Sequence, residues 1–199
     1  MAENTDSEMI SRFKAGELSV FNLLTGMWYE KILGFLYRTV GDIDEAEDVC
    51  QKTFITVYFK LHQLNDSDKF RTWLYRIANN CAIDHLRDRK SSFHGNGRLS
   101  PDGSDGTSDL PETEPADLER RIDATALRRL CEKTLASIPG EQRTVIVMKL
   151  YQDLKFTEIA EVLNIPVNTV KTRMYTGLRT MREALNRNRL IEEILRNAM

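Results

Sequence analysis

Cysteine and histidine are scarce in this chain of 199 residues, and neither type is clustered. The three cysteines, Cys50, Cys81 and Cys131, lie far apart without paired spacing, which argues against a disulfide framework and against a zinc knuckle. We therefore expect all three to be small residues of the core. The three histidines form no pair at metal-ligand spacing, and the chain has neither a phosphate-binding glycine loop nor a nucleophile elbow. The sequence thus predicts no catalytic residue, no metal site and no cofactor.

Long apolar runs are also missing. No stretch approaches the roughly 18 consecutive apolar residues that a membrane span needs. Residues 1–11 lack both the basic and the apolar parts of a secretory signal peptide. With 41% hydrophobic and 29% charged residues, the chain has the composition of a soluble protein. We expect a cytoplasmic protein without a membrane span.

Positive charge is not in excess over the whole chain, whose net charge is −2, but it is unevenly distributed. Residues 1–90 carry 12 basic and 14 acidic side chains, and residues 69–90 alone carry six basic and two acidic ones. Residues 91–118 carry one basic and six acidic side chains, whereas residues 119–199 carry 15 basic and 10 acidic ones. Two separate basic zones, residues 69–90 and residues 119–199, are therefore candidates for contact with nucleic acid.

Residues 91–118 have the composition of a linker. They hold four of the ten glycines, three of the five prolines and few apolar side chains. Such a segment cannot bury enough apolar surface to offset the loss of conformational entropy on ordering. The sequence therefore predicts an N-terminal domain over residues 1–90, a flexible acidic linker over 91–118 and a C-terminal domain over 119–199.

Apolar residues recur at intervals of three and four in both domains, which predicts an all-α fold. One long helix follows the polar residues 41–44, whose carboxylates suit a helix N-terminus. A second covers about residues 69–89, a third covers 127–138, and a fourth carries Val145, Met148 and Tyr151 on its apolar side. The apolar stripe of the first of these helices consists of Ala46, Cys50, Phe54, Val57 and Leu61.

Residues 156–182 (FTEIAEVLNIPVNTVKTRMYTGLRTMR) read as a short helix, a turn and a longer helix. Asn164 tolerates the left-handed backbone that such a turn needs, and Pro166 ends the first helix. Val170, Met174 and Leu178 form the expected inward stripe of the second helix. Gly177 costs roughly 1 kcal/mol relative to alanine inside a helix, so we expect close packing there or a softened helix end.

The outward face of this second helix carries an amide, hydroxyls and a cation: Asn168, Thr172, Tyr175, Thr176 and Arg179. The cations Lys171 and Arg173 lie on the flanks of this face. Base edges in the major groove offer hydrogen bonds and phosphates offer charge, so this chemistry suits a DNA-reading helix. A helical hairpin with a solvated face is the alternative. The coincidence of turn, small residue and flanking cations favours DNA binding.

The whole chain, from about residue 10 to residue 185, resembles the bacterial extracytoplasmic-function (ECF) sigma factors of RNA polymerase. Three motifs carry the resemblance in the family's order: residues 45–54 (EAEDVCQKTF), residues 70–80 (FRTWLYRIANN) and the helix-turn-helix. The resemblance implies sigma region 2 in the N-terminal domain, sigma region 4 in the C-terminal domain, and a non-enzymatic protein that directs promoter-specific initiation.

In the first motif Asp44, Glu47, Asp48 and Gln51 fall on one helical face, opposite the apolar stripe. The spacing alone leaves open whether this face is merely solvated. The resemblance implies that it docks on the β′ clamp helices of core RNA polymerase.

In the second motif Trp73, Arg76 and Asn80 form a stripe separate from Leu74, Ala78 and Cys81, which we assign to the core. Aromatic, guanidinium and amide groups suit the capture of unstacked bases. The resemblance implies that this helix binds the melted minus-10 element and that Asn80 contributes to a pocket for a flipped base. Burial in the core is the strong alternative for Trp73.

The resemblance further implies that Lys171, Thr172, Arg173, Tyr175 and Thr176 read the minus-35 element, with a phosphate contact at Lys149. It implies four partners: the β′ clamp helices and the β flap of core RNA polymerase, promoter DNA, and an anti-sigma factor. The acidic linker is expected to enter basic channels of the polymerase, which deletion of residues 100–114 would test.

Two alternatives stay open. The chain could instead be a dimeric helix-turn-helix regulator with an N-terminal sensor domain, which would bind a symmetric operator without polymerase. Leu190, Ile191, Ile194 and Leu195 form an apolar stripe that suits either a capping helix or a partner-binding tail.

Overall fold

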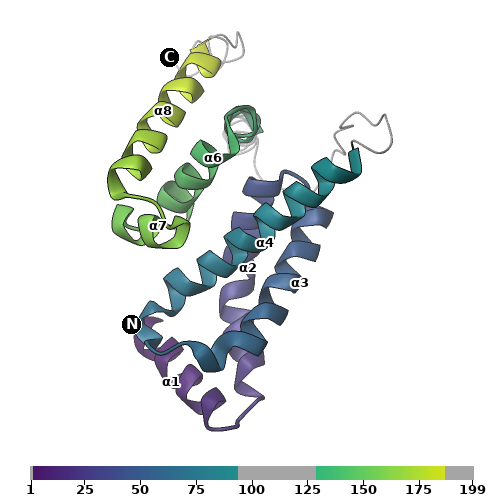
Figure 1. Ribbon diagram of the computed structural model, residues 1–199, viewed down its shortest axis with the longest axis vertical. Helices are drawn as coiled ribbons and strands as arrows, with labels where there is room; N and C mark the ends of the chain where they lie inside the picture. The colour runs from purple at the N-terminus through teal and green to yellow at the C-terminus, as the bar shows by residue number, and fades with distance from the viewer. Residues whose placement is uncertain (1, 94–128, 187–199) are drawn as a thin grey trace, which may run out of the picture.

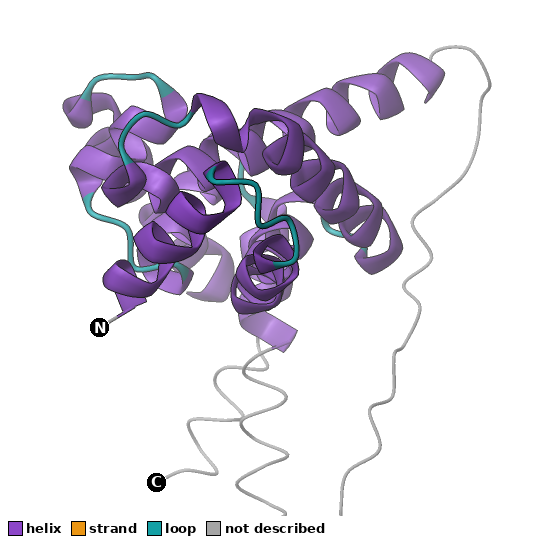
Figure 2. Ribbon diagram, turned by 90° about the horizontal axis from the view of Figure 1, so that it is seen from below, coloured by secondary structure: helices purple, strands orange, loops and turns teal. Residues whose placement is uncertain are grey.

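The computed structural model describes residues 2–93 and 129–186 (Figures 1 and 2). Every regular element in these two ranges is a helix, and they contain no strand, which confirms the predicted all-α class. Most of the predicted linker, all of residues 187–199 with the apolar stripe of Leu190 to Leu195, and Leu127 lie outside the described residues.

The N-terminal domain is built around α2, which packs against α1, α3 and α4 (Figure 1). Its elements are α1 (Ala2–Lys14), α2 (Val20–Val40), α3 (Ile43–Lys60), the 3-10 turns η1 (Leu61–Gln63) and η2 (Ser67–Lys69), and α4 (Phe70–Phe93). Ile32, Phe35 and Leu74 are fully buried where these helices meet. Burying each such side chain stabilises the domain by about 1.5–3 kcal/mol before entropy is counted.

The junction between α2 and α3 follows the chemistry expected of helix ends. Gly41 has a left-handed backbone, φ 97°, and its N–H donates to the Tyr37 carbonyl at 2.8 Å, which closes α2. The Asp42 carboxylate then accepts a hydrogen bond from the Glu45 N–H at 2.9 Å and caps α3. This confirms the prediction that the carboxylates of residues 41–44 begin a helix.

In the described part of the C-terminal domain, residues 129–137 are helical, and this helix ends before Pro139. The domain continues with α6 (Gly140–Ile146), the π-helix η3 (Val147–Tyr151), α7 (Phe156–Leu163) and α8 (Val167–Asn186). Val145 and Met148 are buried, as predicted. Tyr151 is 43% exposed, so its predicted inward position is wrong. The π turn, in which the Gln152 N–H reaches the Val147 carbonyl at 3.2 Å, shifts the register there by one residue.

The two helical domains lie against each other. α4 packs along α7, and α2 contacts α6 and η3 (Figure 1). In contrast, α8 lies on the outer side of its own domain, where it packs on α6 and α7. No helix among the described residues is long and apolar enough to cross a membrane.

Candidate polymerase and nucleic-acid interfaces

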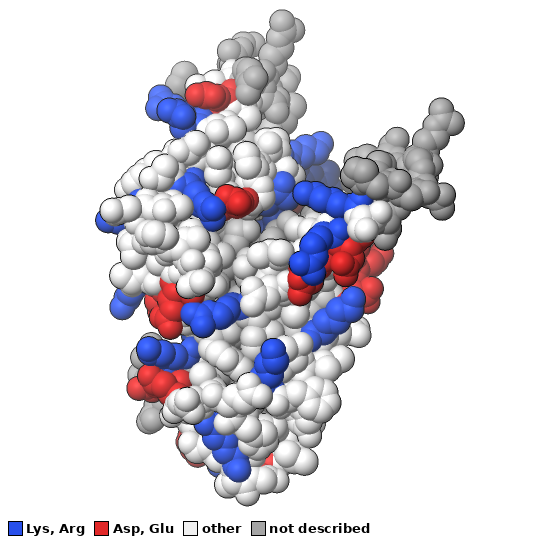
Figure 3. Space-filling view, viewed as in Figure 1, with Lys and Arg blue, Asp and Glu red and all other residues white. Residues whose placement is uncertain are grey.

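The polar face predicted for residues 44–51 is present on α3. The side chains of Asp44, Glu47, Asp48 and Gln51 are all exposed, while the apolar stripe from Ala46 to Leu61 is buried on the opposite side. The predicted division of this helix into two faces is therefore confirmed. Figure 3 shows acidic side chains gathered where α3 begins beside the last turns of α4.

Glu45 belongs to a different environment from its acidic neighbours. Its carboxylate accepts a hydrogen bond from Arg89 Nη1 at 2.8 Å and lies 3.1 Å from His85 Nε2, both on α4. These contacts hold the start of α3 against α4. The Glu45 carboxylate thus forms contacts within the N-terminal domain, whereas the exposed carboxylates next to it are available to a partner.

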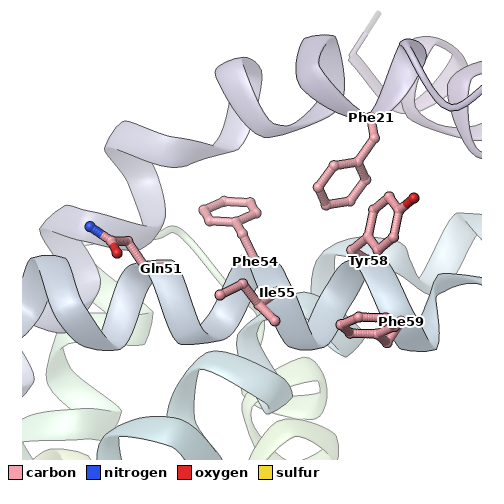
Figure 4. Close-up of a pocket in the computed structure, with 6 residues that line it drawn as sticks. All are labelled: Phe21, Gln51, Phe54, Ile55, Tyr58 and Phe59. Carbon is pink, nitrogen blue, oxygen red and sulfur yellow. The ribbon is translucent and has the colours of Figure 1, made fainter.

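An apolar groove continues the exposed face of α3 toward its C-terminal end (Figure 4). It has a volume of about 360 Å³ and is lined by Phe21, Gln51, Phe54, Ile55, Tyr58 and Phe59. Phe59 is 72% exposed, and Ile55 lies one turn before it. The sequence analysis missed this groove, although the spacing of Gln51, Ile55 and Phe59 at intervals of four was a usable signal.

The three residues predicted to contact the melted strand have different environments on α4. Asn80 is exposed, whereas Trp73 is half-buried against the core, with its ring centroid 6.1 Å from that of Phe70. Arg76 is exposed, but its Nη2 donates to the Glu161 carbonyl of α7 at 2.6 Å. Leu74 and Ala78 are fully buried and Cys81 is half-buried, which agrees with their assignment to the core.

The three cysteines are free thiols in the described structure. Cys50 is buried, and Cys81 and Cys131 are half-buried. Burial raises the pKa of Cys50 to about 12, so its thiol stays protonated at neutral pH. No group of three or more His, Cys, Asp or Glu side chains within the described ranges could hold a metal ion.

The helix-turn-helix has the expected geometry. α7 ends at Asn164, whose backbone is left-handed with φ 52° and ψ 48°, as the tolerance of asparagine for this region predicted. The Ile165 N–H donates to the Ala160 carbonyl at 3.1 Å and closes the turn before Pro166. Ile159 and Ala160 are buried where α7 meets the rest of the domain.

The inward stripe of α8 is Val170, Met174 and Gly177, not Leu178 as predicted. Leu178 is 36% exposed. A Cβ atom on Gly177 would lie 2.7 Å from Ile146 Cδ1 and 3.1 Å from Gln142 Cβ. α8 therefore crosses α6 so closely that a Cβ at position 177 would require the Ile146 side chain to shift, which is the close packing anticipated for Gly177. That crossing rotates Leu178 away from the core.

The reading face predicted for α8 is largely accessible. Asn168, Lys171, Thr172 and Tyr175 are exposed, and Thr176 is half-buried. Arg173 is also half-buried, and its Nη2 forms an ion pair with Glu141 Oε2 of α6 at 2.5 Å.

Lys149 also contacts its own domain. Its Nζ donates to the Leu154 carbonyl at 3.1 Å and lies 5.5 Å from the centre of the Phe156 ring. Two of the cations expected to contact the minus-35 DNA, Lys149 and Arg173, thus have protein partners in this structure.

Family profiles match both halves of the chain. The profile described as Sigma-70 region 2 matches residues 25–92, and the one described as Sigma-70, region 4 matches residues 128–181. The ECF RNA polymerase sigma factor SigW of Bacillus subtilis is 34% identical over 185 residues, covering 88% of this chain and 94% of SigW. The RNA polymerase sigma-H factor of Pseudomonas aeruginosa is 31% identical over the full length of both chains.

This chain belongs to the ECF sigma factors of RNA polymerase. Family members are sigma factors that direct promoter-specific initiation, and the comparisons give no support to a dimeric helix-turn-helix regulator. Two of the solved structures that share the fold are RpoE and CnrH. RpoE of Bartonella quintana, solved in complex with the anti-sigma factor NepR, matches with a TM-score of 0.67 at 16% identity, over 84% of this chain and 98% of RpoE. CnrH, solved with the cytosolic domain of CnrY, matches with a TM-score of 0.62 at 23% identity, over 91% and 97% of the two chains.

Proposed function

We propose that this ECF sigma factor docks on core polymerase through α3, captures the melted minus-10 strand on α4 and reads the minus-35 element with α8. The observation that carries the proposal is the exposed polar face of α3 in a chain that also holds a helix-turn-helix.

The docking surface on α3 combines two kinds of contact. Asp44, Glu47 and Asp48 offer carboxylates to basic side chains of the polymerase, and charge complementarity of this kind speeds association and fixes register. The groove beside Phe59 offers apolar area, which supplies affinity when it is covered. The clamp helices of the β′ subunit are the proposed partner for both, and the β flap is the proposed partner of region 4.

Strand capture on α4 needs no nucleotide hydrolysis and no catalytic residue. Stacking of an unpaired base on an aromatic side chain is worth about 1–3 kcal/mol, which offsets the stacking that the base loses in the duplex. Asn80 supplies an exposed amide with both a donor and an acceptor for a base edge. Arg76 and Trp73 lie along the same stripe, one and two turns earlier on the helix.

Recognition of the duplex falls to the exposed face of α8. The Asn168 amide, the Thr172 hydroxyl and the Tyr175 hydroxyl are groups that can hydrogen-bond base edges in the major groove. Lys171 on the flank can contact a phosphate and adds affinity without sequence preference. Both DNA contacts are made in the cytoplasm, and an anti-sigma factor, of the class that binds RpoE, is the proposed regulator.

Run-off transcription with purified core polymerase on genomic fragments, followed by mapping of the start sites, tests this proposal. We expect discrete transcripts that require both the chain and core enzyme. A chain that gives no transcripts but binds a symmetric duplex site tightly as a dimer would overturn the proposal.

A further inference from the structure

The first helix, α1, contacts α2 through a buried pair of polar groups. The indole Nε1 of Trp28 on α2 donates a hydrogen bond to Oδ1 of Asp6 on α1 at 3.1 Å. Both residues are buried, with exposed fractions of 6% for Trp28 and 7% for Asp6. Of the charged side chains whose burial the structure describes, Asp6 alone is buried. A buried carboxylate is costly unless it is hydrogen-bonded, so its presence calls for a physical reason.

Anchoring of α1 does not provide that reason. Burial raises the pKa of the Asp6 carboxyl, while the Trp28 N–H and the charge of Lys31 lower this pKa in part. Because the net shift is upward, the carboxyl group contributes less to stability as the pH rises through its pKa in the folded chain. Ile10 and Phe13, which are almost completely buried, already hold α1 on the domain through apolar contacts. An apolar residue at position 6 would serve that purpose better than an acid.

The partner of Asp6 belongs to an aromatic cluster behind the start of α4. The Trp28 ring packs edge to face with Phe70 and Tyr75 of α4, at centroid distances of 5.8 and 6.3 Å. Phe70 in turn lies 6.1 Å from the ring of Trp73, which belongs to the proposed strand-binding stripe. A hydrogen bond acts only within a narrow range of angles, so the Asp6 carboxylate fixes the rotation of the Trp28 ring.

We propose that Asp6 is a positioning residue for capture of the melted minus-10 strand, acting from α1 through Trp28 and Phe70 on Trp73. This inference rests on the proposed function of α4. The hydrogen bond holds the Trp28 ring in one orientation, the edge-to-face contact holds Phe70, and Trp73 is thereby presented to an unstacked base at one angle. A Trp73 ring that is already ordered loses less conformational entropy when a base stacks on it.

Three substitutions separate this role from a general effect on stability. Asp6→Leu removes the acceptor and leaves a buried indole N–H without a partner. Asp6→Asn removes the charge but keeps a side-chain oxygen that can accept the same hydrogen bond. Glu8→Leu makes the acid-to-leucine change at an exposed position of the same helix and is the matched control. Urea unfolding of each variant establishes that it is folded under the assay conditions.

The first readout is binding of a labelled single-stranded oligonucleotide, the non-template strand of a mapped minus-10 element, to holoenzyme reconstituted with each variant. We expect Asp6→Leu to bind it roughly two- to twelvefold more weakly, the factor that one hydrogen bond represents. Asp6→Asn and Glu8→Leu should bind it as the wild type does, and all three should keep wild-type affinity for core polymerase. Unchanged binding in Asp6→Leu, an equal loss of core affinity, or failure of Asp6→Asn to preserve binding would overturn the proposal.

The second readout tests the route through Trp73. The chain has two tryptophans, so the proton–nitrogen NMR spectrum of the free full-length protein contains two indole N–H signals. Asp6→Leu should shift the Trp73 signal as well as the Trp28 signal, and an unchanged Trp73 signal would contradict the route. In a Trp73→Ala background, Asp6→Leu should cause little further loss of oligonucleotide binding, whereas a full further loss would also contradict it.

Trp28→Phe removes the donor of the same hydrogen bond and keeps an aromatic ring. It assigns the two indole signals, and it carries the same predicted loss of oligonucleotide binding if Asp6→Leu does not fold. Asn80→Ala, measured in the same assay, separates the inference from the proposed function. If Asn80→Ala weakens oligonucleotide binding and Asp6→Leu does not, only the positioning role is wrong. If neither variant weakens it, strand capture on α4 is wrong as well.

Discussion

Single side chains of this sigma factor have environments that differ sharply even when they share a stripe. Asn80 is exposed on α4, while Arg76 on the same face is bound to the Glu161 carbonyl of region 4. On α8, Lys171 is exposed and Arg173 is paired with Glu141. The expected effect of substituting each side chain therefore depends on whether it is exposed or already bound to another part of the protein.

Asn80→Ala should slow open-complex formation while leaving core binding intact, because the amide contacts DNA only after melting. Loss of a base contact of about 1–3 kcal/mol predicts a roughly five- to 160-fold lower rate or yield of open complex. Permanganate footprinting of the melted region measures it, with Ile83→Ala, an exposed apolar residue elsewhere on α4, as the control. An equal loss of core affinity would contradict the assignment.

We propose that Arg173 contacts a phosphate of the minus-35 element, so Arg173→Ala should weaken promoter binding by the holoenzyme and lower the slope of log affinity against log salt by about one. The pair with Glu141 does not prevent this, since partly exposed ion pairs are worth only about 0–1 kcal/mol and the guanidinium can exchange partners. Glu141→Gln is the control and should keep the slope. If the slope were unchanged in Arg173→Ala, Arg173 would not contact DNA, and its role would be limited to the ion pair with Glu141.

At the scale of helices, some features of the structure could be predicted from the sequence and others could not. The two faces of α3, its capped start at Asp42 and the left-handed Asn164 could all be predicted, because each depends on local spacing or backbone preference. The π turn that exposes Tyr151 could not, because a one-residue change of register has no local signature. The Arg76 contact joins residues 85 positions apart, which no periodic pattern specifies.

Gly177→Ala should destabilise the α6–α8 pair. The gain of roughly 1 kcal/mol in helix propensity is opposed by overpacking against Ile146, which typically costs about 1–3 kcal/mol. We expect a net loss of about 1 kcal/mol in the urea unfolding of the C-terminal domain. Gly26 lies on α2 of the N-terminal domain, where an added Cβ meets nothing within 4 Å. Gly26→Ala should therefore raise the free energy of unfolding of the N-terminal domain by about 0.5–1 kcal/mol. A stabilised Gly177→Ala protein would contradict the close crossing.

Asp48→Arg tests the face of α3. Reversing one charge at the centre of this face should weaken core binding at least tenfold, since like charges juxtaposed in an interface cost several kcal/mol. Glu8→Arg on α1 makes the same charge change outside the face and should have little effect. The measurement is equilibrium binding of labelled chain to core polymerase, and equal affinities of the two variants would remove α3 from the interface.

At the scale of the whole molecule, the two helical domains pack against each other through α4 and α7 and through α2, α6 and η3. The proposed polymerase-docking face and the proposed strand-binding stripe lie on adjacent helices of region 2, α3 and α4, which pack against each other. In region 4, α8, the proposed reading helix, lies on the outer side, and α7 packs on α4. The arrangement suits a protein that reaches full DNA-binding competence only on its polymerase.

The most direct test of this account compares promoter binding by the purified chain alone and by the chain with core polymerase, at one salt concentration on one mapped promoter. The account predicts weak binding by the free chain, tight association with core, and a footprint over both elements only when core is present. A chain that does not bind core but protects the same promoter by itself would contradict it.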